Sequence, residues 1–220
     1  LLKMDFLGLR TLTVIQNAVL LARRKQPELN INQIDYNDQK VLDYIGTGKT
    51  DGVFQLESAG MKGFMKELKP HNLEDVIAGI SLYRPGPMDF IPQYIRGKND
   101  SSSITYDCPQ LEPILAPTYG CIVYQEQVMQ IVRDLAGYSL GRSDLLRRAM
   151  SKKKAAVMEK ERKIFIYGDE ETGVPGCIKN GIDEQTANKI YDEMIDFAKY
   201  AFNKSHAAAY AVVSYQTAWL

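Results

Sequence analysis

The feature that most constrains the fold is a run of apolar residues at helical spacing, bounded by helix-ending and helix-capping residues. The run consists of Val128, Ile131, Val132 and Leu135, with polar residues between them. This spacing predicts an amphipathic helix with one buried face. Gly137 is expected to end that helix, because glycine readily adopts left-handed backbone angles. Ser139 is expected to cap the next helix, because its hydroxyl oxygen accepts hydrogen bonds from exposed backbone N–H groups.

The stretch that follows is strongly basic. Residues 142–154 carry six basic residues and one acid, Asp144. We expect the apolar pair 145–146 to anchor the inner face of this helix, so that Arg147 and Arg148 point outward. Arginine presents a planar fork of donors that matches phosphate oxygens. A solvated basic face is the alternative interpretation of such a charge run.

Apolar spacing and capping residues predict helices along most of the chain. We expect helices near residues 12–24, 38–45, 59–68, 73–82, 155–167 and 184–202, and another from Ser205. Strand patterns are short and lie at residues 2–6 and 122–123. The predicted fold class is therefore mainly α, a multi-helix domain with a short β segment at the N-terminus and little other sheet.

Composition narrows the possible functions. The 220 residues balance 27 basic against 27 acidic side chains, which argues against a globally basic nucleic-acid binder but allows a local basic patch. Three widely spaced cysteines without a CxxC motif indicate reduced thiols in a cytoplasmic protein. With only two histidines, a structural zinc site is not expected. We see no signal peptide and no apolar run of membrane length.

Two short motifs suggest phosphate chemistry. Lys3 and Asp5 share one face of the predicted N-terminal strand, where a carboxylate beside an ammonium group could hold a metal ion and a phosphate. A surface ion pair is the simpler alternative.

Residues 46–50 look like the end of a phosphate-binding P-loop. The motif requires a glycine where this chain has Asp43, and no strand leads into it, so we interpret the segment as a polar turn.

The C-terminal helix forms a third candidate site. Asn203, Lys204 and His206 gather donors at its predicted N-terminus, which is a favourable place for an anion. His206 and Tyr210 are four residues apart and therefore share a face. A buried, alanine-rich core helix is an equally good interpretation of this segment.

Six segments in one order resemble the alpha subunit of bacterial DNA polymerase III, the replicative C-family polymerase. The segments are KMDFLGLRTLT, DGVFQLES, YRPGPM, YQEQVMQI, GRSDLLRRAMSKKK and FNKSHAAAYA. The resemblance covers nearly the whole chain. It implies that residues 1–12 end the palm domain and that residues 13–220 form a fingers domain truncated at its C-terminus. The chain begins at Leu1 within an apolar segment and ends within a predicted helix, which we interpret as a piece of a larger protein.

The resemblance also implies roles for individual residues. Asp5 matches the third metal-binding and catalytic carboxylate of the palm, and Lys3 matches a lysine that contacts the phosphates of the incoming nucleotide. The other nucleotide-binding candidates are Arg142, Arg147, Arg148, Lys152, Asn203, Lys204, His206 and Tyr210. Gln55, Glu57 and Arg84 lie in family motifs without a defined role. The implied reaction is two-metal nucleotidyl transfer with Mg²⁺, in which the primer 3′ hydroxyl attacks the α-phosphate.

The implied partners are the DNA template-primer and deoxynucleoside triphosphates and, for the full protein, the sliding clamp and other replisome subunits, but no membrane. One departure from the family is decisive for activity. The other two metal carboxylates of the family form an Asp-x-Asp motif upstream, and this chain contains no such motif. We therefore expect this piece alone to be inactive. The alternative function is a stand-alone helical module that binds nucleic acid or protein through its basic helix.

Overall fold

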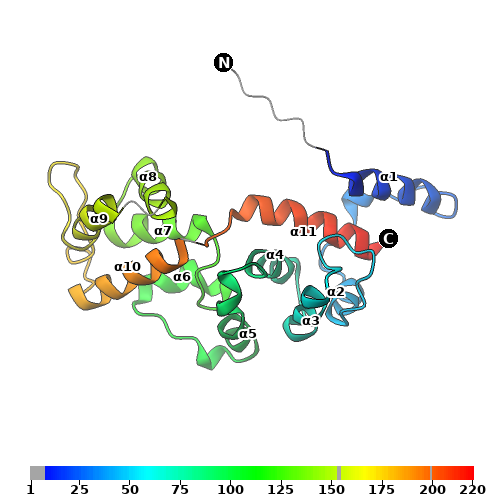
Figure 1. Cartoon of the computed structure of the whole chain (residues 1–220), viewed down its shortest axis with the longest axis horizontal. Helices are drawn as coiled ribbons and strands as arrows, with labels where there is room; N and C mark the ends of the chain where they lie inside the picture. Colours follow the sequence, from blue (N-terminus) through cyan, green and yellow to red (C-terminus); the bar gives the residue numbers. More distant parts are fainter. Residues whose placement is uncertain (1–7, 153–154, 199) are drawn as a thin grey trace, which may run out of the picture. The chain divides into compact units, whose positions relative to one another are not determined.

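The structure is a computed structural model that describes residues 8–152, 155–198 and 200–220. Within these residues it contains eleven α-helices and several short 3₁₀ helices (Figure 1). The described part has no extended strand, and its β-type pairing consists of two isolated bridges, Tyr124 with Phe202 and Asp169 with Val174. The mainly α prediction is confirmed. The strand expected at residues 2–6 lies outside the described residues.

The chain divides into two compact units, of which unit 1 comprises Leu1–Ile80 and His206–Leu220. Its helices are α1 (Arg10–Ala22), α2 (Gln39–Gly46), α3 (Ala59–Leu68), much of α4 (Leu73–Leu82) and most of α11 (Lys204–Trp219). Buried apolar side chains form its core, including Leu42, Ile45, Leu56, Met65 and Leu68. Tyr215 is also fully buried, and its hydroxyl donates a hydrogen bond to the Asp35 carbonyl at 2.9 Å. Helix α11 is thereby tied to the loop that precedes α2.

Capping residues set the start of the short helices in unit 1. The Asp38 carboxylate accepts the Lys40 N–H at 2.9 Å at the start of α2. The Ser58 hydroxyl accepts the Met61 N–H at 3.2 Å at the start of α3. Each cap satisfies a backbone donor that the first helical turn leaves without a partner. Residues 46–50, which resemble the end of a P-loop, comprise the last residue of α2 and the turn and coil after it, in agreement with the predicted polar turn.

Unit 2 comprises Ser81–Ser205. Its helices are α5 (Ile91–Asn99), α6 (Glu112–Leu115), α7 (Gln125–Ala136), α8 (Leu140–Ser151), α9 (Ala155–Tyr167) and α10 (Glu184–Ala198). Helix α8 packs between α7 and α9, and α10 packs on α9 (Figure 1). The apolar face predicted for α7 is buried, and it forms one core with Phe165, Cys177 and Tyr191. Gly137 ends α7 with a positive φ of 78°, as expected.

Two expectations for unit 2 are wrong. Residues 122–123 form no strand, because the neighbouring backbone pairs with a single residue, Phe202. The Phe202 N–H donates to the Val123 carbonyl at 3.2 Å, and the Gln125 N–H donates to the Phe202 carbonyl at 2.9 Å. The helix expected to continue to residue 202 ends at Ala198. Residues 200–202 are not helical, and Phe202 is therefore able to make these two hydrogen bonds.

The apolar pair in α8 also differs from expectation. Leu146 is buried at 2% exposure, but Leu145 is 68% exposed. Neighbouring helical residues point about 100° apart, so two adjacent leucines do not share one buried face. Leu146 anchors α8 together with the buried Ala149 and Met150, and Leu145 is exposed.

Two further findings concern the chain as a whole. Cys108, Cys121 and Cys177 are free and buried, in agreement with the predicted reduced thiols. Among the residues that the structure describes, no helix combines the length and apolar character that crossing a membrane requires.

Candidate functional site

The predicted site residues fall into three groups. Lys3 and Asp5 lie outside the described residues. Unit 1 holds Gln55, Glu57, His206 and Tyr210. Unit 2 holds Arg84, Arg142, Arg147, Arg148, Lys152, Asn203 and Lys204.

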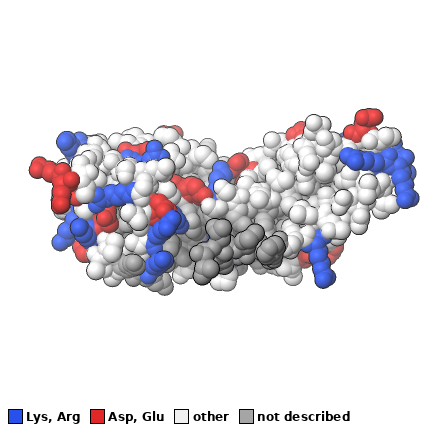
Figure 2. Space-filling view, turned by 90° about the horizontal axis from the view of Figure 1, so that it is seen from above, with Lys and Arg blue, Asp and Glu red and all other residues white. Residues whose placement is uncertain are grey.

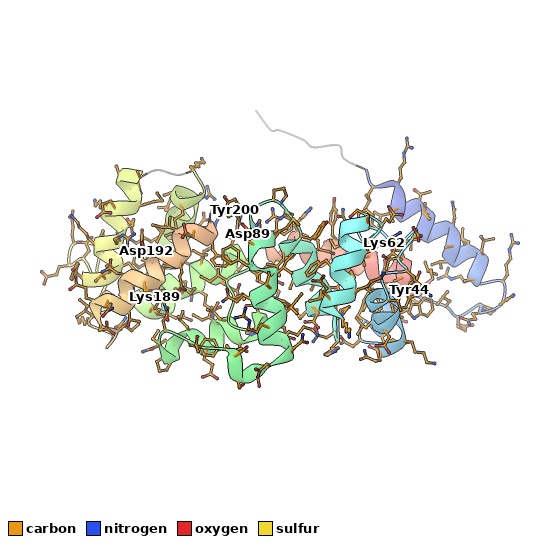
Figure 3. The ribbon with its side chains drawn as sticks, turned by 60° about the horizontal axis from the view of Figure 1, so that its bottom comes forward. Tyr44, Lys62, Asp89, Lys189, Asp192 and Tyr200 are labelled. Atoms are coloured by element: carbon orange, nitrogen blue, oxygen red, sulfur yellow. The ribbon has the colours of Figure 1, made fainter. Side chains whose placement is uncertain are left out.

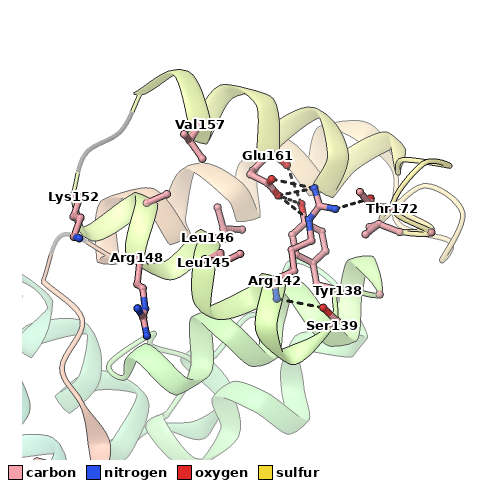
Figure 4. A pocket seen from close by; sticks show the side chains of 14 residues that line it. Tyr138, Ser139, Arg142, Leu145, Leu146, Arg148, Lys152, Val157, Glu161 and Thr172 are labelled. Atoms are coloured by element: carbon pink, nitrogen blue, oxygen red, sulfur yellow. Dashed lines mark hydrogen bonds and ion pairs between the residues drawn. The ribbon is translucent and has the colours of Figure 1, made fainter.

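Helix α8 borders a cavity of about 940 Å³ that lies between α8, α9 and residues 172–174 (Figure 4). The Ser139 hydroxyl caps α8 by accepting the Arg142 N–H at 3.3 Å, as the sequence predicted. Apolar side chains from both helices line the cavity, including Leu145 and Val157, which are largely exposed. Arg148 and Lys152 add positive charge to the same cavity.

Arg142 is held by a network that joins α8 to α9. Its Nη2 and Nε donate to the Glu161 carboxylate at 3.0 and 3.2 Å, and its Nη1 donates to the Thr172 hydroxyl at 2.6 Å (Figure 4). The Tyr138 hydroxyl donates to the same carboxylate at 2.8 Å. Burial alone lowers the pKa of Arg142, but the hydrogen bonds and charge of Glu161 outweigh it, so the pKa lies above its ordinary value. The guanidinium group is therefore engaged inside the protein.

Arg147 is also held internally. Its Nη2 and Nε donate to the Asp144 carboxylate at 2.6 and 3.1 Å, and its Nη1 donates to the side-chain oxygen of Gln125 at 2.9 Å. The Arg147 side chain is only 20% exposed. The pKa of the Asp144 carboxyl lies below its ordinary value, mainly because Arg147 donates hydrogen bonds to it. The positive charges of Arg147 and Arg148 lower the pKa of Asp144 further.

Arg148 and Lys152 are the accessible cations of α8. The Arg148 side chain is 62% exposed and is held through Nε by Asp144 at 2.7 Å. Lys152 is exposed at the C-terminal end of the helix, and within the described residues it forms no ion pair. The two residues are four apart, which places them on one face of the helix, and Figure 4 shows both pointing away from the Arg142 network. They can therefore meet an anion together.

Charge elsewhere on the surface is mixed. On the face drawn in Figure 2, Lys and Arg side chains lie among Asp and Glu side chains and do not form a continuous basic surface. Ion pairs also occur on α10, where Lys189 and Asp192 (Figure 3) pair with Asp107 and Arg162, respectively. A small group of cations on α8 is compatible with the net charge of zero for the whole chain.

The donors predicted at the start of α11 already have an internal anion. The Glu126 carboxylate accepts the Lys204 backbone N–H at 3.1 Å and the Asn203 side-chain amide at 2.9 Å. The Lys204 ammonium group lies 5.3 Å from the centre of the Tyr124 ring. A carboxylate of the chain itself therefore lies where the sequence predicted that an anion could bind, and ligand binding there stays a prediction.

Arg84 stabilises the same region of unit 2. Its Nη2 donates to the Tyr200 carbonyl at 2.6 Å, and its Nε donates to the Ser81 carbonyl at 3.2 Å. The guanidinium carbon lies 4.1 Å from the centre of the Phe202 ring, a cation–π contact. Burial lowers the pKa of Arg84. These contacts point to a structural role in the YRPGPM motif.

Two of the candidates in unit 1, His206 and Tyr210, belong to a row of three rings. The His206 ring packs against Tyr210 at a tilt of 38° with ring centres 4.3 Å apart, and the Tyr210 and Phe54 ring centres are 5.3 Å apart. Gln55, next to Phe54, has a positive φ of 65° and an exposed side chain, and Glu57 is exposed as well. A residue other than glycine in this conformation is strained, and such strain gathers at functional sites.

Sequence reasoning missed the acceptors that hold the arginines. Asp144 could have been found from its spacing, because it lies three and four residues before Arg147 and Arg148 on one helix. Gln125 and Glu161 come from other helices and gave no local signal.

The described residues do not fit a metal centre. No three His, Cys, Asp or Glu side chains within residues 8–152, 155–198 and 200–220 come together in a way that could hold a metal ion. The Mg²⁺ prediction rests on Asp5, which lies outside this range.

Comparisons with known proteins agree with the motif pattern. A family model described as the bacterial DNA polymerase III alpha subunit finger domain matches residues 11–173. The whole chain is similar to proteins named DNA polymerase III subunit alpha, with 50% identity to that of Halalkalibacterium halodurans, 50% to that of Thermus aquaticus and 46% to that of Bacillus subtilis (strain 168). It covers 19%, 18% and 19% of those proteins, so it spans about a fifth of the length of the curated relatives that it matches. With more than half of its residues matched by the finger-domain model, the chain belongs to the bacterial DNA polymerase III alpha subunit family.

Proposed function

We propose that this chain is part of a replicative DNA polymerase and that helix α8 holds the triphosphate of the incoming deoxynucleotide. The observation that supports this proposal is the pair of accessible cations, Arg148 and Lys152, on one face of α8 beside a cavity of about 940 Å³. An arginine fork and a lysine point charge four residues apart suit neighbouring phosphate groups. The exposed side chains of Leu145 and Val157 add apolar surface to the same cavity.

The four basic residues predicted at this site do not have equal access. Arg142 binds Glu161 and Thr172, and Arg147 binds Asp144 and Gln125. A phosphate would have to displace these partners to reach either guanidinium group. Triphosphate contact by Arg142 and Arg147 stays a prediction, and we assign the main contact to Arg148 with help from Lys152.

The wider assignment follows from family membership. We infer that residues 1–12 end a palm domain and that residues 13–220 are fingers, within a longer subunit that acts on a DNA template-primer in the bacterial cytoplasm. Lys3 and Asp5 would belong to the palm, which would supply the Mg²⁺ chemistry. The row of His206, Tyr210 and Phe54 presents flat rings of the kind that nucleic-acid bases stack on. The sliding clamp and other replisome subunits would bind elsewhere on that subunit.

The rival function is a helical module that grips nucleic acid or a protein through α8 and takes no part in nucleotide binding. Steady-state primer extension with the full-length subunit separates the two functions. A charge-assisted hydrogen bond to phosphate contributes about 1.5–3 kcal/mol, so Arg148→Ala should raise the nucleotide KM or lower kcat by roughly ten- to a hundred-fold. Primer-template affinity should change little, because a duplex distributes its phosphates over many contacts.

Arg133→Ala is the matched control, since Arg133 is an exposed arginine on the neighbouring helix α7. It removes the same charge from the same unit and should leave nucleotide kinetics unchanged. If Arg148→Ala weakens DNA binding and leaves nucleotide kinetics unchanged, α8 is a nucleic-acid clamp and the proposed function is wrong.

A further inference from the structure

Asp144 connects the two arginines of α8 through one carboxylate. Its Oδ1 accepts hydrogen bonds from Nη2 and Nε of Arg147 at 2.6 and 3.1 Å. Its Oδ2 lies 2.7 Å from Nε of Arg148. Asp144 is also the one acid in the basic stretch of residues 142–154. An acid beside cations that bind phosphate weakens the local positive potential, so its presence there requires a reason.

Arg147 is fixed from a second direction by helix α7. Its Nη1 donates to the side-chain oxygen of Gln125 at 2.9 Å, and the Gln125 amide nitrogen donates to the Ala201 carbonyl at 3.1 Å. The Gln125 backbone is held as well, through its N–H bond to Phe202. Arg147 therefore links Asp144 to Gln125 of α7 and fixes the position of the Asp144 carboxylate.

The contact with Asp144 limits the directions in which the Arg148 guanidinium group can point. Because Nε is held and the guanidinium group is planar, the Asp144 contact restricts how the two outer nitrogens can point. The contact of Arg148 with Asp144 runs through Nε at 2.7 Å. The Arg148 side chain is 62% exposed and borders the cavity. Part of the rotamer freedom of Arg148 is thus lost before any ligand arrives.

We propose that Asp144 is a positioning residue for polyphosphate recognition, which tethers Arg148 through Nε and presents its two outer nitrogens as a preoriented fork. This inference rests on the proposed function of α8. Asp144 makes no contact with the phosphate itself, because two anions would repel each other. Its effect passes through Arg148, with Arg147 and Gln125 as the support.

The simpler alternative is an ordinary ion pair along a helix, which contributes little to stability and nothing to binding. Asp144→Asn separates the two roles by the sign of its effect. If Asp144 acts only through its charge, its removal strengthens the positive potential and lowers the nucleotide KM. If Asp144 positions Arg148, the loss of the carboxylate releases the fork, and the KM rises in spite of the more favourable charge.

The experiment measures primer-extension KM and kcat for deoxynucleoside triphosphates with the full-length subunit. We expect Asp144→Asn to raise KM about five- to ten-fold, which is part of what the Arg148 contact itself contributes. Asp144→Glu should restore most of the loss, because it keeps the carboxylate. Asp134→Asn is the matched control: Asp134 is an exposed acid on α7, and its removal changes the net charge by the same amount.

If Arg148→Ala raises KM, the proposed function stands, and two results would then overturn the inference. The first is a KM for Asp144→Asn at or below the wild-type value. The second is a KM for Asp144→Glu as high as that for Asp144→Asn. If Arg148→Ala leaves KM unchanged, the proposed function is wrong and the role of Asp144 falls with it. Alkylation of Cys177, which is fully buried in unit 2, shows whether each variant remains folded.

Discussion

Replacing Glu161 by glutamine tests whether the Arg142 network holds α8 and α9 together. The Glu161 carboxylate accepts hydrogen bonds from Arg142 at 3.0 and 3.2 Å and from Tyr138 at 2.8 Å. Glutamine keeps the size of the side chain and one acceptor oxygen, but it removes the charge that balances Arg142. The variant therefore leaves a largely buried cation with a weaker partner, Asp169, whose Oδ2 lies 4.0 Å from Nη1 of Arg142.

The expected loss of stability lies between two limits. Removing one partner of a fully buried ion pair costs about 3–5 kcal/mol, whereas an exposed pair contributes about 0–1 kcal/mol. The side chains of Arg142 and Glu161 are 18% and 15% exposed, so solvent still screens part of the interaction. We expect Glu161→Gln to destabilise unit 2 by about 2 kcal/mol, which is roughly a thirty-fold increase in its unfolded fraction.

Alkylation of Cys177 under native conditions measures this loss, because the thiol is buried in the core of unit 2 and reacts only when that core opens. In the full-length subunit the labelling rate of Glu161→Gln should rise with the unfolded fraction. Glu159→Gln is the matched control on the same helix, since Glu159 is 65% exposed and lies 3.9 Å from Arg162. Equal labelling rates for Glu161→Gln and wild type would refute the stabilising role of the network.

Three further predictions concern local structure. Gln55→Gly should be neutral or slightly stabilising in thermal unfolding. Glycine relieves roughly 1–2 kcal/mol of left-handed backbone strain in the folded protein, but it also increases the conformational entropy of the unfolded chain. A large loss of stability would mean that the Gln55 side chain makes native contacts. Gly86→Ala should destabilise unit 2 by at least about 2 kcal/mol, because its Cβ would lie 2.4 Å from the Tyr200 ring at a φ of +102°; unchanged labelling of Cys177 would contradict this. Burial raises the pKa of Cys121 and Cys177 to about 12, so their thiolate fraction at pH 8 is on the order of 10⁻⁴, and iodoacetamide should modify them only after unfolding; rapid labelling of the folded protein would show that the cores open easily.

Local signals in the sequence predicted much of the fold. Helices α3 and α4 have the predicted bounds, Ala59–Leu68 and Leu73–Leu82. Ser58 and Ser139 cap the helices that they were expected to cap. These features depend on residues within one helical turn of each other, and this is why spacing and capping rules capture them.

Features that depend on tertiary contacts were not predictable in the same way. Arg142 and its acceptor Glu161 are 19 residues apart on different helices, and Arg147 and Gln125 are 22 apart. The sequence showed that the arginines were present, but not that two of them are engaged internally. The prediction for Leu145 was wrong for another reason. Leu145 is apolar and adjacent to the buried Leu146, so it was assigned to the same buried face of α8. Its exposure beside the cavity became visible only in the structure.

The central claim is that Arg148 on α8 contacts the triphosphate of the incoming nucleotide. The most direct test is an experimental structure of the full-length subunit with a primer-template and an incoming deoxynucleoside triphosphate. We predict that the outer nitrogens of Arg148 lie about 2.7–3.2 Å from phosphate oxygens of the nucleotide, while Nε remains bound to Asp144. Outer nitrogens of Arg148 that contact the DNA backbone or only solvent, with the triphosphate bound elsewhere, would contradict the claim.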